Sequence, residues 1–327
     1  MNTSKSIDIV TIGESMLLMQ PISEVPLTYA SLFTKTIAGA ESNVAIGLSR
    51  LGHKVRWISR LGRDPFGDTI SSLLAGEGVD VALVERDEHY PTAMYFKEYK
   101  GYGDPNVYYY RKGSAMSRLS PAHVKDDWFN GAKHLHVTGI TPALGPHSAE
   151  AIRKAMIRAR ELGLTVSFDP NLRRKLWSEE ESRHSLLSLI PLCDLFLPGE
   201  EEAEFLIGKM ATEAWGAHFL ARGPSTVVIK LGERGSVGFT RKFTVNASPH
   251  AVQRVVDTIG AGDAFAAGLL SSFVEYGSYE DRDTLSLALK KANMMGALAT
   301  QFKGDWEGLP GKDELDRLLS GAIIVTR

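Results

Sequence analysis

A glycine-rich segment that ends in a carboxylate is the strongest candidate for chemistry in this chain. The sequence DTIGAGDAFAAGLLSSF covers residues 257–273 and changes at Asp263 from a loop of small residues to an apolar helical pattern. Gly260 and Gly262 allow the main chain to approach a ligand closely. The helix is expected from Ala264, and the unpaired N–H groups at its start favour an anion. The segment therefore predicts a phosphate site.

Asp263 has the chemistry that phosphoryl transfer to an alcohol requires. The reaction needs donors around the phosphoryl oxygens and a group that accepts the proton of the attacking hydroxyl. Asp263 can be this acceptor, and the N–H groups of Gly260, Ala261 and Gly262 can supply the donors of an anion hole. Aspartate is also a common helix cap, so a purely structural role stays open on these residues alone.

The composition excludes several classes of protein. The chain has 327 residues, 43% of them hydrophobic and 23% charged, which is typical of a folded globular domain. Its formal net charge is -2 without a run of Lys or Arg, so neither a nucleic acid nor a membrane is expected as a partner. The start of the chain lacks a leader-like apolar segment, and the single cysteine, Cys193, is expected to be a buried apolar residue. These features predict a cytoplasmic protein with small-molecule ligands.

Strand-like runs alternate with helical patterns along most of the chain. IDIVTIG at 7–13 is followed by ESNVAIGLSRLG at 41–52, and the alternation continues. It predicts an α/β fold, a doubly wound and mostly parallel sheet covered on both faces. Two aromatic β-rich stretches interrupt it and are expected to form antiparallel strands of a small β-sheet lid, whose exposed aromatic surface predicts a homo-oligomer. The predicted lid comprises 15–37 and 90–112, and the main domain 1–14, 38–89 and 113–327.

Two arginines suggest the kind of substrate. In VYYYRKGS the side chains of Tyr109 and Arg111 share one face of a strand. Arg173 follows a strand in FDPNLRRKLW, at the edge where ligands gather in parallel sheets. Arginine binds a carboxylate through two parallel N–H donors. We therefore expect both arginines to converge on the acidic end of a sugar acid, with Arg111 as the main anchor, although surface charges are an alternative.

Two motifs resemble the signatures of the ribokinase-like (PfkB) carbohydrate kinases. DTIGAGDAFAAGLL resembles the C-terminal signature, and AGAESNVAIGLSRLG at 38–52 the N-terminal one, except that Glu41 stands where many members have a small residue. The resemblance covers residues 7–320 and implies an ATP-dependent kinase with a doubly wound domain and a lid. Further segments, among them YYYRKGSA and GDWEGLP, resemble the branch that acts on 2-keto-3-deoxygluconate, which implies phosphorylation of its 6-hydroxyl.

The resemblance also implies roles for individual residues, with Asp263 as the catalytic base and Gly260, Ala261 and Gly262 as the anion hole. Those implied to bind the substrate are Gly39, Ala40, Asn43, Tyr95, Tyr109, Arg111, Arg173, Asp263 and Asp305. Those implied to bind ATP are Asn171, Arg173, Lys230, Gly232, Gly235, Gly260, Gly262 and Asn293. Glu202 in PGEEEAE is implied to handle Mg²⁺ through water, with Gly199 in place of the family's Asn. Asp257 and Thr258 fall in a loop that implies K⁺ as a further cofactor.

Three other functions are alternatives to this interpretation of the sequence. A kinase of the same family acting on fructose or another keto sugar acid is the nearest alternative. Fructokinases usually carry an aspartate four or five residues after the residue equivalent to Glu14, where this chain has Leu18 and Met19. A NAD-dependent dehydrogenase is disfavoured because no G-x-G-x-x-G follows the first strand. A sensor without catalysis is disfavoured by the intact loop before Asp263.

Overall fold

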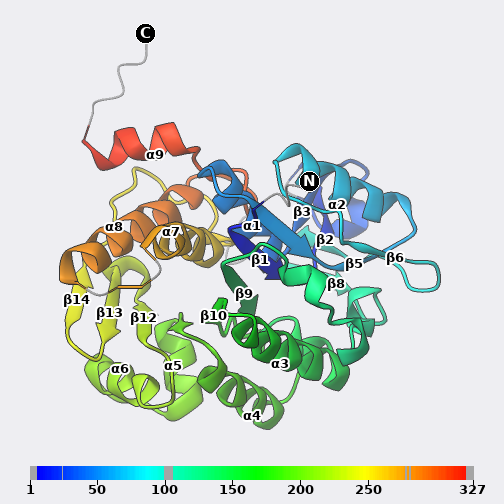
Figure 1. Cartoon of the computed structure of the whole chain (residues 1–327). Coiled ribbons are helices and arrows are strands. Elements are labelled where there is room, and N and C mark those ends of the chain that lie inside the picture. The colour runs from blue at the N-terminus through cyan, green and yellow to red at the C-terminus, as the bar shows by residue number, and fades with distance from the viewer. Residues whose placement is uncertain (1–5, 24, 99–105, 277, 280, 322–327) are drawn as a thin grey trace.

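An eight-stranded sheet forms the centre of the molecule (Figure 1). The computed structural model describes residues 6–23, 25–98, 106–276, 278–279 and 281–321. From β12 to β4 the neighbouring strands are parallel, whereas β13 and β14 extend the sheet as antiparallel strands. This confirms the predicted doubly wound, mostly parallel sheet. Its order is β14 (Thr244–Ala247), β13 (Ser236–Thr240), β12 (Thr226–Lys230), β11 (Leu195–Phe196), β10 (Thr165–Asp169), β9 (His134–Thr138), β1 (Ile9–Ile12) and β4 (Val55–Ile58).

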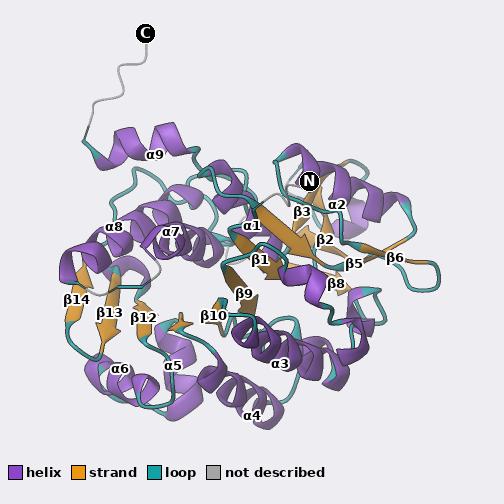
Figure 2. Ribbon diagram, in the orientation of Figure 1, coloured by secondary structure: helices purple, strands orange, loops and turns teal. Residues whose placement is uncertain are grey.

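Helices cover both faces of this sheet, as Figure 2 shows. Each face has its own hydrophobic core, because parallel strands are apolar on both sides. One core contains residues of α1 (Ala40–Arg50), α2 (Pro65–Gly76), α7 (Ala261–Tyr276), α8 (Arg282–Ala299) and α9 (Lys312–Leu319). The other contains residues of α3 (Pro146–Glu161), α4 (Glu179–Leu189), α5 (Glu200–Ile207) and α6 (Thr212–Leu220). Within the described ranges no helix is both long and apolar enough to cross a membrane.

A second sheet is built from the two aromatic stretches that interrupt the alternation. Its order is β3 (Phe33–Ala38), β2 (Met16–Pro21), β7 (Met94–Glu98) and β8 (Asn106–Tyr110). The pairs β2–β3 and β7–β8 are antiparallel, as expected, but β2 and β7 are parallel where the two stretches meet. Two short strands, β5 (Arg60–Gly62) and β6 (Glu85–Asp87), pair separately. The predicted domain boundaries include residues 1–5, 24, 99–105 and 322–327, which lie outside the described residues.

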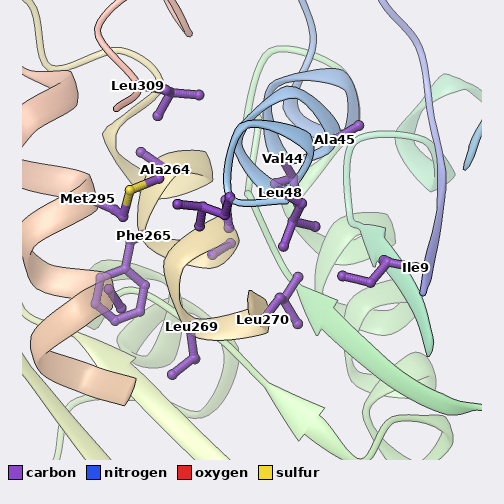
Figure 3. Packing of buried hydrophobic residues seen from close by; sticks show 14 of the residues in the cluster. Ile9, Val44, Ala45, Leu48, Ala264, Phe265, Leu269, Leu270, Met295 and Leu309 are labelled. Carbon is purple, nitrogen blue, oxygen red and sulfur yellow. The ribbon is translucent and has the colours of Figure 1, made fainter. Parts of the chain in front are cut away.

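Helix α7 is fixed between α1 and α8 by close packing (Figure 3). A Cβ atom on Gly47 of α1 would lie 2.8 Å from the Cβ of Ala267, and one on Gly268 would lie 3.0 Å from the Cα of Ala292 in α8. The small residues of AFAAG therefore let both neighbouring helices approach the backbone of α7. Residues Ala264 to Phe273 of this helix are all buried. Such packing gives the first turn of α7 a defined position.

The single cysteine, Cys193, is buried. Cys193 is 1% exposed and lies in the hydrophobic core next to α3 and α4. Its thiol donates a hydrogen bond to the carbonyl oxygen of Ile190, and burial raises the pKa of the thiol. The predicted structural role is confirmed.

Candidate active site

Polar residues gather where parallel strands of the large sheet end. Asp169 is the last residue of β10, Lys230 is the last residue of β12, and Glu14 follows β1. Because these strands are parallel, their carboxyl ends lie at one edge of the sheet, where ligands bind in open α/β folds. The first turns of α1 and α7 bring Asn43 and Asp263 to the same place, since the side-chain amide of Asn43 donates to the carboxylate of Asp263.

Two pockets meet at this edge. The outer pocket has a volume of about 850 Å³ and is lined by residues that follow β10 and β12 and by residues of α7 and α8. The inner pocket is lined by residues of α1, the small sheet and the loop before α7. Arg173 lines both pockets, and residues 258–263 contribute to both walls. Ligands bound in the two pockets would therefore face each other at the start of α7.

The start of α7 differs in one respect from the sequence prediction. The helix begins at Ala261, three residues before the expected start, so Asp263 is in its first turn and does not cap it. Gly260 has a φ of +81° and packs against the backbone of Asp305, where no side chain would fit. The N–H of Ala261 donates to the carbonyl oxygen of Thr258 at 3.3 Å. The anion hole proposed at Gly260, Ala261 and Gly262 therefore has one donor already engaged.

Asp263 is buried and held by two side-chain amides. Asn43 donates to its Oδ2 at 2.8 Å, and Asn171 donates to its Oδ1 at 3.2 Å. Burial raises the pKa of Asp263 to about 6, against the opposing hydrogen bond from Asn43 and the charge of Arg173. A carboxylate with a raised pKa binds a proton more readily than an exposed one, which suits a general base.

A second polar cluster extends from Asp263 toward the outer pocket. Asn171 has a φ of +39°, and its N–H donates to Oδ1 of Asp169. The other oxygen of Asp169 accepts a hydrogen bond of 2.6 Å from Nζ of Lys230. Burial alone would lower the pKa of Lys230, but the charges of Asp169 and Glu202 outweigh this effect and raise it. The ammonium thus stays charged beside a pocket that is large enough for a nucleotide.

Glu202 is less available to a metal ion than the sequence suggested. Its Oε1 accepts the N–H of Leu172 at 2.7 Å, and its Oε2 accepts the N–H of Gly199 at 2.6 Å. In the part of the chain that the structure describes, no three His, Cys, Asp or Glu side chains are grouped to hold a metal. These residues fit an Mg²⁺ ion carried by phosphate and water oxygens, with Glu202 at most bonded through water.

Every residue predicted to bind the substrate lines the inner pocket. Tyr95 and Tyr109 come from β7 and β8, and their rings lie 5.6 Å apart. Arg111 follows β8 and is 8% exposed, with its guanidinium 5.6 Å from the centre of the Tyr109 ring. One nitrogen of Arg111 lies 2.7 Å from a carboxylate oxygen of Glu14, while its Nε makes no hydrogen bond to any described residue. The small sheet therefore presents a buried guanidinium with a donor still unused.

Most residues predicted to bind ATP line the outer pocket, but two do not. Arg173, Lys230, Gly232, Gly235, Gly262 and Asn293 belong to its wall. Asn171 instead supports Asp263, and Gly260 lines the inner pocket. The side-chain amide of Asn293 donates to the carbonyl oxygens of Ala247 and Ser248, which ties α8 to the residues after β14.

Leu18 and Met19, which stand where fructokinases usually carry a sugar-binding aspartate, do not line the inner pocket. Leu18 is wholly buried in the core of the small sheet. The lining residues of this segment are Glu14 and Met16. Leu18 shares a face of β2 with Met16 but is buried by its neighbours in the small sheet, and this depth could not be read from the sequence.

Several important residues were missed by the sequence analysis. Asp169 binds Lys230, Glu14 binds Arg111, and the ammonium of Lys97 contacts both Asp257 and Asp305. Each pair joins residues at least 61 positions apart in the chain, so no local pattern reveals it. Only Asp169 carried a signal, because an acidic residue ends a strand at the ligand-binding edge of the sheet.

Comparison with known proteins agrees with this geometry. The sequence pattern of the pfkB family carbohydrate kinases matches residues 6–311. The chain is 42% identical to the 2-dehydro-3-deoxygluconokinase of Bacillus subtilis (strain 168), over 98% of this chain and 97% of that protein. It is similar to the crystal structure of a PfkB protein from Polaromonas sp. JS666, with a TM-score of 0.86, 38% identity and coverage of 95% and 99% of the two chains.

A further solved structure contains ligands. It is a double mutant of the fructokinase from Vibrio cholerae O395 in a form with fructose, ADP and potassium ion bound. Its TM-score is 0.84 at 30% identity, over 97% of this chain and 99% of that chain. The match over nearly the whole chain and the two pockets joined at the glycine loop lead to one identification. The chain belongs to the pfkB family of carbohydrate kinases.

Proposed function

We propose that the protein transfers the γ-phosphoryl group of ATP to the 6-hydroxyl of 2-keto-3-deoxygluconate. The sugar acid binds in the inner pocket and ATP in the outer pocket. The hydroxyl oxygen forms a new bond to the γ-phosphorus, and its proton passes to the carboxylate of Asp263. The bond between the γ-phosphorus and the bridging oxygen breaks, and ADP leaves. The products are 2-keto-3-deoxy-6-phosphogluconate and ADP.

The groups around the pocket junction support each part of this reaction. The N–H groups at the start of α7 and the guanidinium of Arg173 surround the place where the phosphoryl group passes. The ammonium of Lys230 lies in the wall of the outer pocket, where it balances phosphate charge. Glu202 would hold Mg²⁺ through water beside the phosphate oxygens, and the ion would neutralise part of the charge on the phosphates.

The choice of a sugar acid rests on Arg111. This guanidinium is buried in the inner pocket, and its Nε donor is directed to no described residue. Burying a donor without a partner is unfavourable, so a ligand that accepts from it gains affinity. Tyr109 beside it adds a phenol hydroxyl. A carboxylate on the substrate would accept from this donor. Glu14 binds another nitrogen of Arg111 and neutralises part of its charge, but it leaves the Nε donor for the substrate.

The test is an ADP-release assay with 2-keto-3-deoxygluconate, other keto sugar acids, fructose and ribose. We expect Arg111→Ala to lower kcat/KM for the sugar acid by roughly 30- to 1000-fold and to leave the KM for ATP nearly unchanged. Arg111→Lys should recover only part of this loss, because it restores the charge without the two-pronged geometry. Thermal melting of each variant reports whether the loss of the partner of Glu14 has disturbed the fold.

Fructose is the alternative substrate, supported by the likeness to the fructokinase from Vibrio cholerae O395. If the wild-type enzyme phosphorylates fructose as efficiently as the sugar acid, the proposed substrate is wrong. An equal effect of Arg111→Ala on neutral and acidic substrates would likewise remove the carboxylate from the proposal. In both cases the kinase reaction itself would stand.

A further inference from the structure

A lysine ammonium is buried between two carboxylates below the glycine loop. The side chain of Lys97, on β7, has no exposed surface. Its Nζ lies 3.1 Å from Oδ2 of Asp257 and 3.2 Å from Oδ1 of Asp305. The partners are 160 and 208 positions away in the sequence. Burying a charged group is costly, so an ammonium in this position depends on its carboxylate partners.

The two carboxylates lie on either side of the loop that leads into α7. Asp257 begins the loop, and its Oδ1 accepts the N–H of Ile259. Asp305 belongs to the segment that packs against the loop from outside, because its carbonyl oxygen would lie 2.0 Å from a Cβ on Gly260. Lys97 therefore connects both sides of the loop whose next residues form the start of α7. The loop begins only six residues before Asp263.

The same aspartate is the residue that the sequence assigned to a potassium site. A potassium ion bound by the side chain of Asp257 would need a carboxylate oxygen whose charge is not already balanced. In this structure Oδ2 of Asp257 faces the ammonium of Lys97 and Oδ1 faces a backbone N–H. A second cation next to this carboxylate would be repelled by the ammonium, with little water to screen it. Asp257 thus does not fit a potassium site while Lys97 is in place.

We propose that Lys97 is the resident cation of this loop: it positions the start of α7 for phosphoryl transfer, so the enzyme works without a monovalent metal ion. The inference rests on the proposed kinase reaction but not on the identity of the sugar. It also couples the small sheet to the anion hole, because β7 supplies both Lys97 and the pocket residue Tyr95. Lys97 acts through Asp257 and Asp305 and is a positioning residue.

A melting experiment tests the proposal without any substrate. The ligand-free wild-type protein is melted in tetramethylammonium chloride and in potassium chloride at equal ionic strength, and Lys97→Ala is melted in the same two salts. We expect the same Tm in both salts for the wild type. We expect potassium to raise the Tm of Lys97→Ala by on the order of 2 °C, because the vacated site then binds the ion. A potassium-dependent Tm of the wild type overturns the proposal.

Activity in the same salts provides the second measurement, with whichever sugar the wild type phosphorylates. The wild-type rate should change by less than about twofold between the salts, since no ion site is to be filled. Lys97→Ala should lose roughly 10- to 100-fold in kcat and regain part of it with potassium, ammonium or methylammonium. A loss that none of these ions reduces, in a folded variant, overturns the proposal. Failure of the wild type to phosphorylate any sugar instead contradicts the proposed function.

The control is Lys35→Ala, which removes a lysine of β3 in the same sheet that donates to the hydroxyl of Thr69 at the surface. It should show no dependence on the salt, and a response equal to that of Lys97→Ala overturns the proposal. If Lys97→Ala does not fold, Lys97→Gln keeps most of the side-chain volume and takes its place. The wild-type comparison decides independently of both variants.

Discussion

Replacement of Asp263 by asparagine separates a catalytic base from a helix-terminal structural residue. The change keeps the size of the side chain and removes its ability to accept the proton of the sugar hydroxyl. Asn43 and Asn171, which donate to the carboxylate at 2.8 and 3.2 Å, then face an amide with only one acceptor oxygen. We expect kcat to fall by a factor on the order of 10² to 10⁴ and the binding of sugar and ATP to change little.

The Asp263→Asn change should lower kcat without lowering the free energy of unfolding. Burial raises the pKa of Asp263 from 3.8 to about 6, so its contribution to stability is fully present below pH 3.8 and is lost as the pH rises through about 6. The difference corresponds to roughly 3 kcal/mol at pH 8, from which the weakened hydrogen bonds must be subtracted. The free energy of unfolding of Asp263→Asn at pH 8 should therefore be equal to or higher than that of the wild type.

The pH dependence of kcat/KM is a third test of the role of Asp263. In wild-type enzyme, kcat/KM should decline below pH 6 as the carboxylate protonates, because about one tenth of it remains ionised at pH 5. The residual activity of the variant should lack this decline. The exposed Asp313→Asn on α9 is the matched control and should retain the wild-type rate and profile. A folded Asp263→Asn enzyme with nearly normal turnover would refute the assignment.

Two further predictions concern the small sheet and the buried carboxyl group of Glu41. Residues of the small sheet line the inner pocket, and a lid role predicts that saturating sugar acid slows hydrogen exchange of β2, β7 and β8 together. Unchanged exchange in all three, with α6 as the control, speaks against a lid. Burial raises the pKa of Glu41 from 4.5 to about 7, so its contribution to stability is lost as the pH rises through about 7. Glu41→Gln should therefore have a Tm that exceeds the wild-type Tm by more at pH 9 than at pH 5, and a pH-independent difference in melting curves would contradict this.

The architecture followed from local sequence patterns because those patterns have local causes. Alternating strands and helices with apolar runs can only be buried in a sheet covered on both faces. The helical pattern at 41–52 corresponds to α1, and Gly52 lies just beyond the helix at a φ of +92°. The parallel pairing of β2 with β7 was not predictable, because it depends on how residues 38–89 bring the two stretches together. The sequence showed two aromatic stretches but not their relative direction.

The residues of the candidate site also differ in whether a local sequence pattern could predict them. Asp263 and the glycines before it are adjacent in the chain, so their spacing indicated a phosphate site before any contact was known. The start of α7 was misplaced because Gly262 is a poor helix former next to a glycine loop, whereas the packing of α1 and α8 on the helix helps to decide where it begins. Ion pairs such as Lys97 with Asp257 arise only when distant segments fold together. Such contacts need the structure.

Glu41 shows how a departure from the family pattern can be accommodated. A small residue is usual at this position, yet here the carboxyl group is wholly buried and accepts hydroxyl hydrogen bonds from Thr138 and Thr141. The space for it exists because Gly13 has no side chain: a Cβ there would lie 2.1 Å from Cδ of Glu41. The residues at positions 13 and 41 are therefore constrained as a pair.

The charge of Glu41 matters as much as its size. Burial raises the pKa of Glu41 to about 7, and the charge of Asp263 adds to this shift. Between about pH 5 and pH 6, where an exposed glutamate is mostly ionised, the carboxyl group of Glu41 is therefore mostly neutral and bonded to the two threonines. A second buried negative charge beside the base would repel the phosphate groups that the start of α7 attracts. Burial of Glu41 thus reduces the negative charge beside Asp263 at a pH below about 7, against the hydrogen bonds from Thr138 and Thr141, which favour the ionised form.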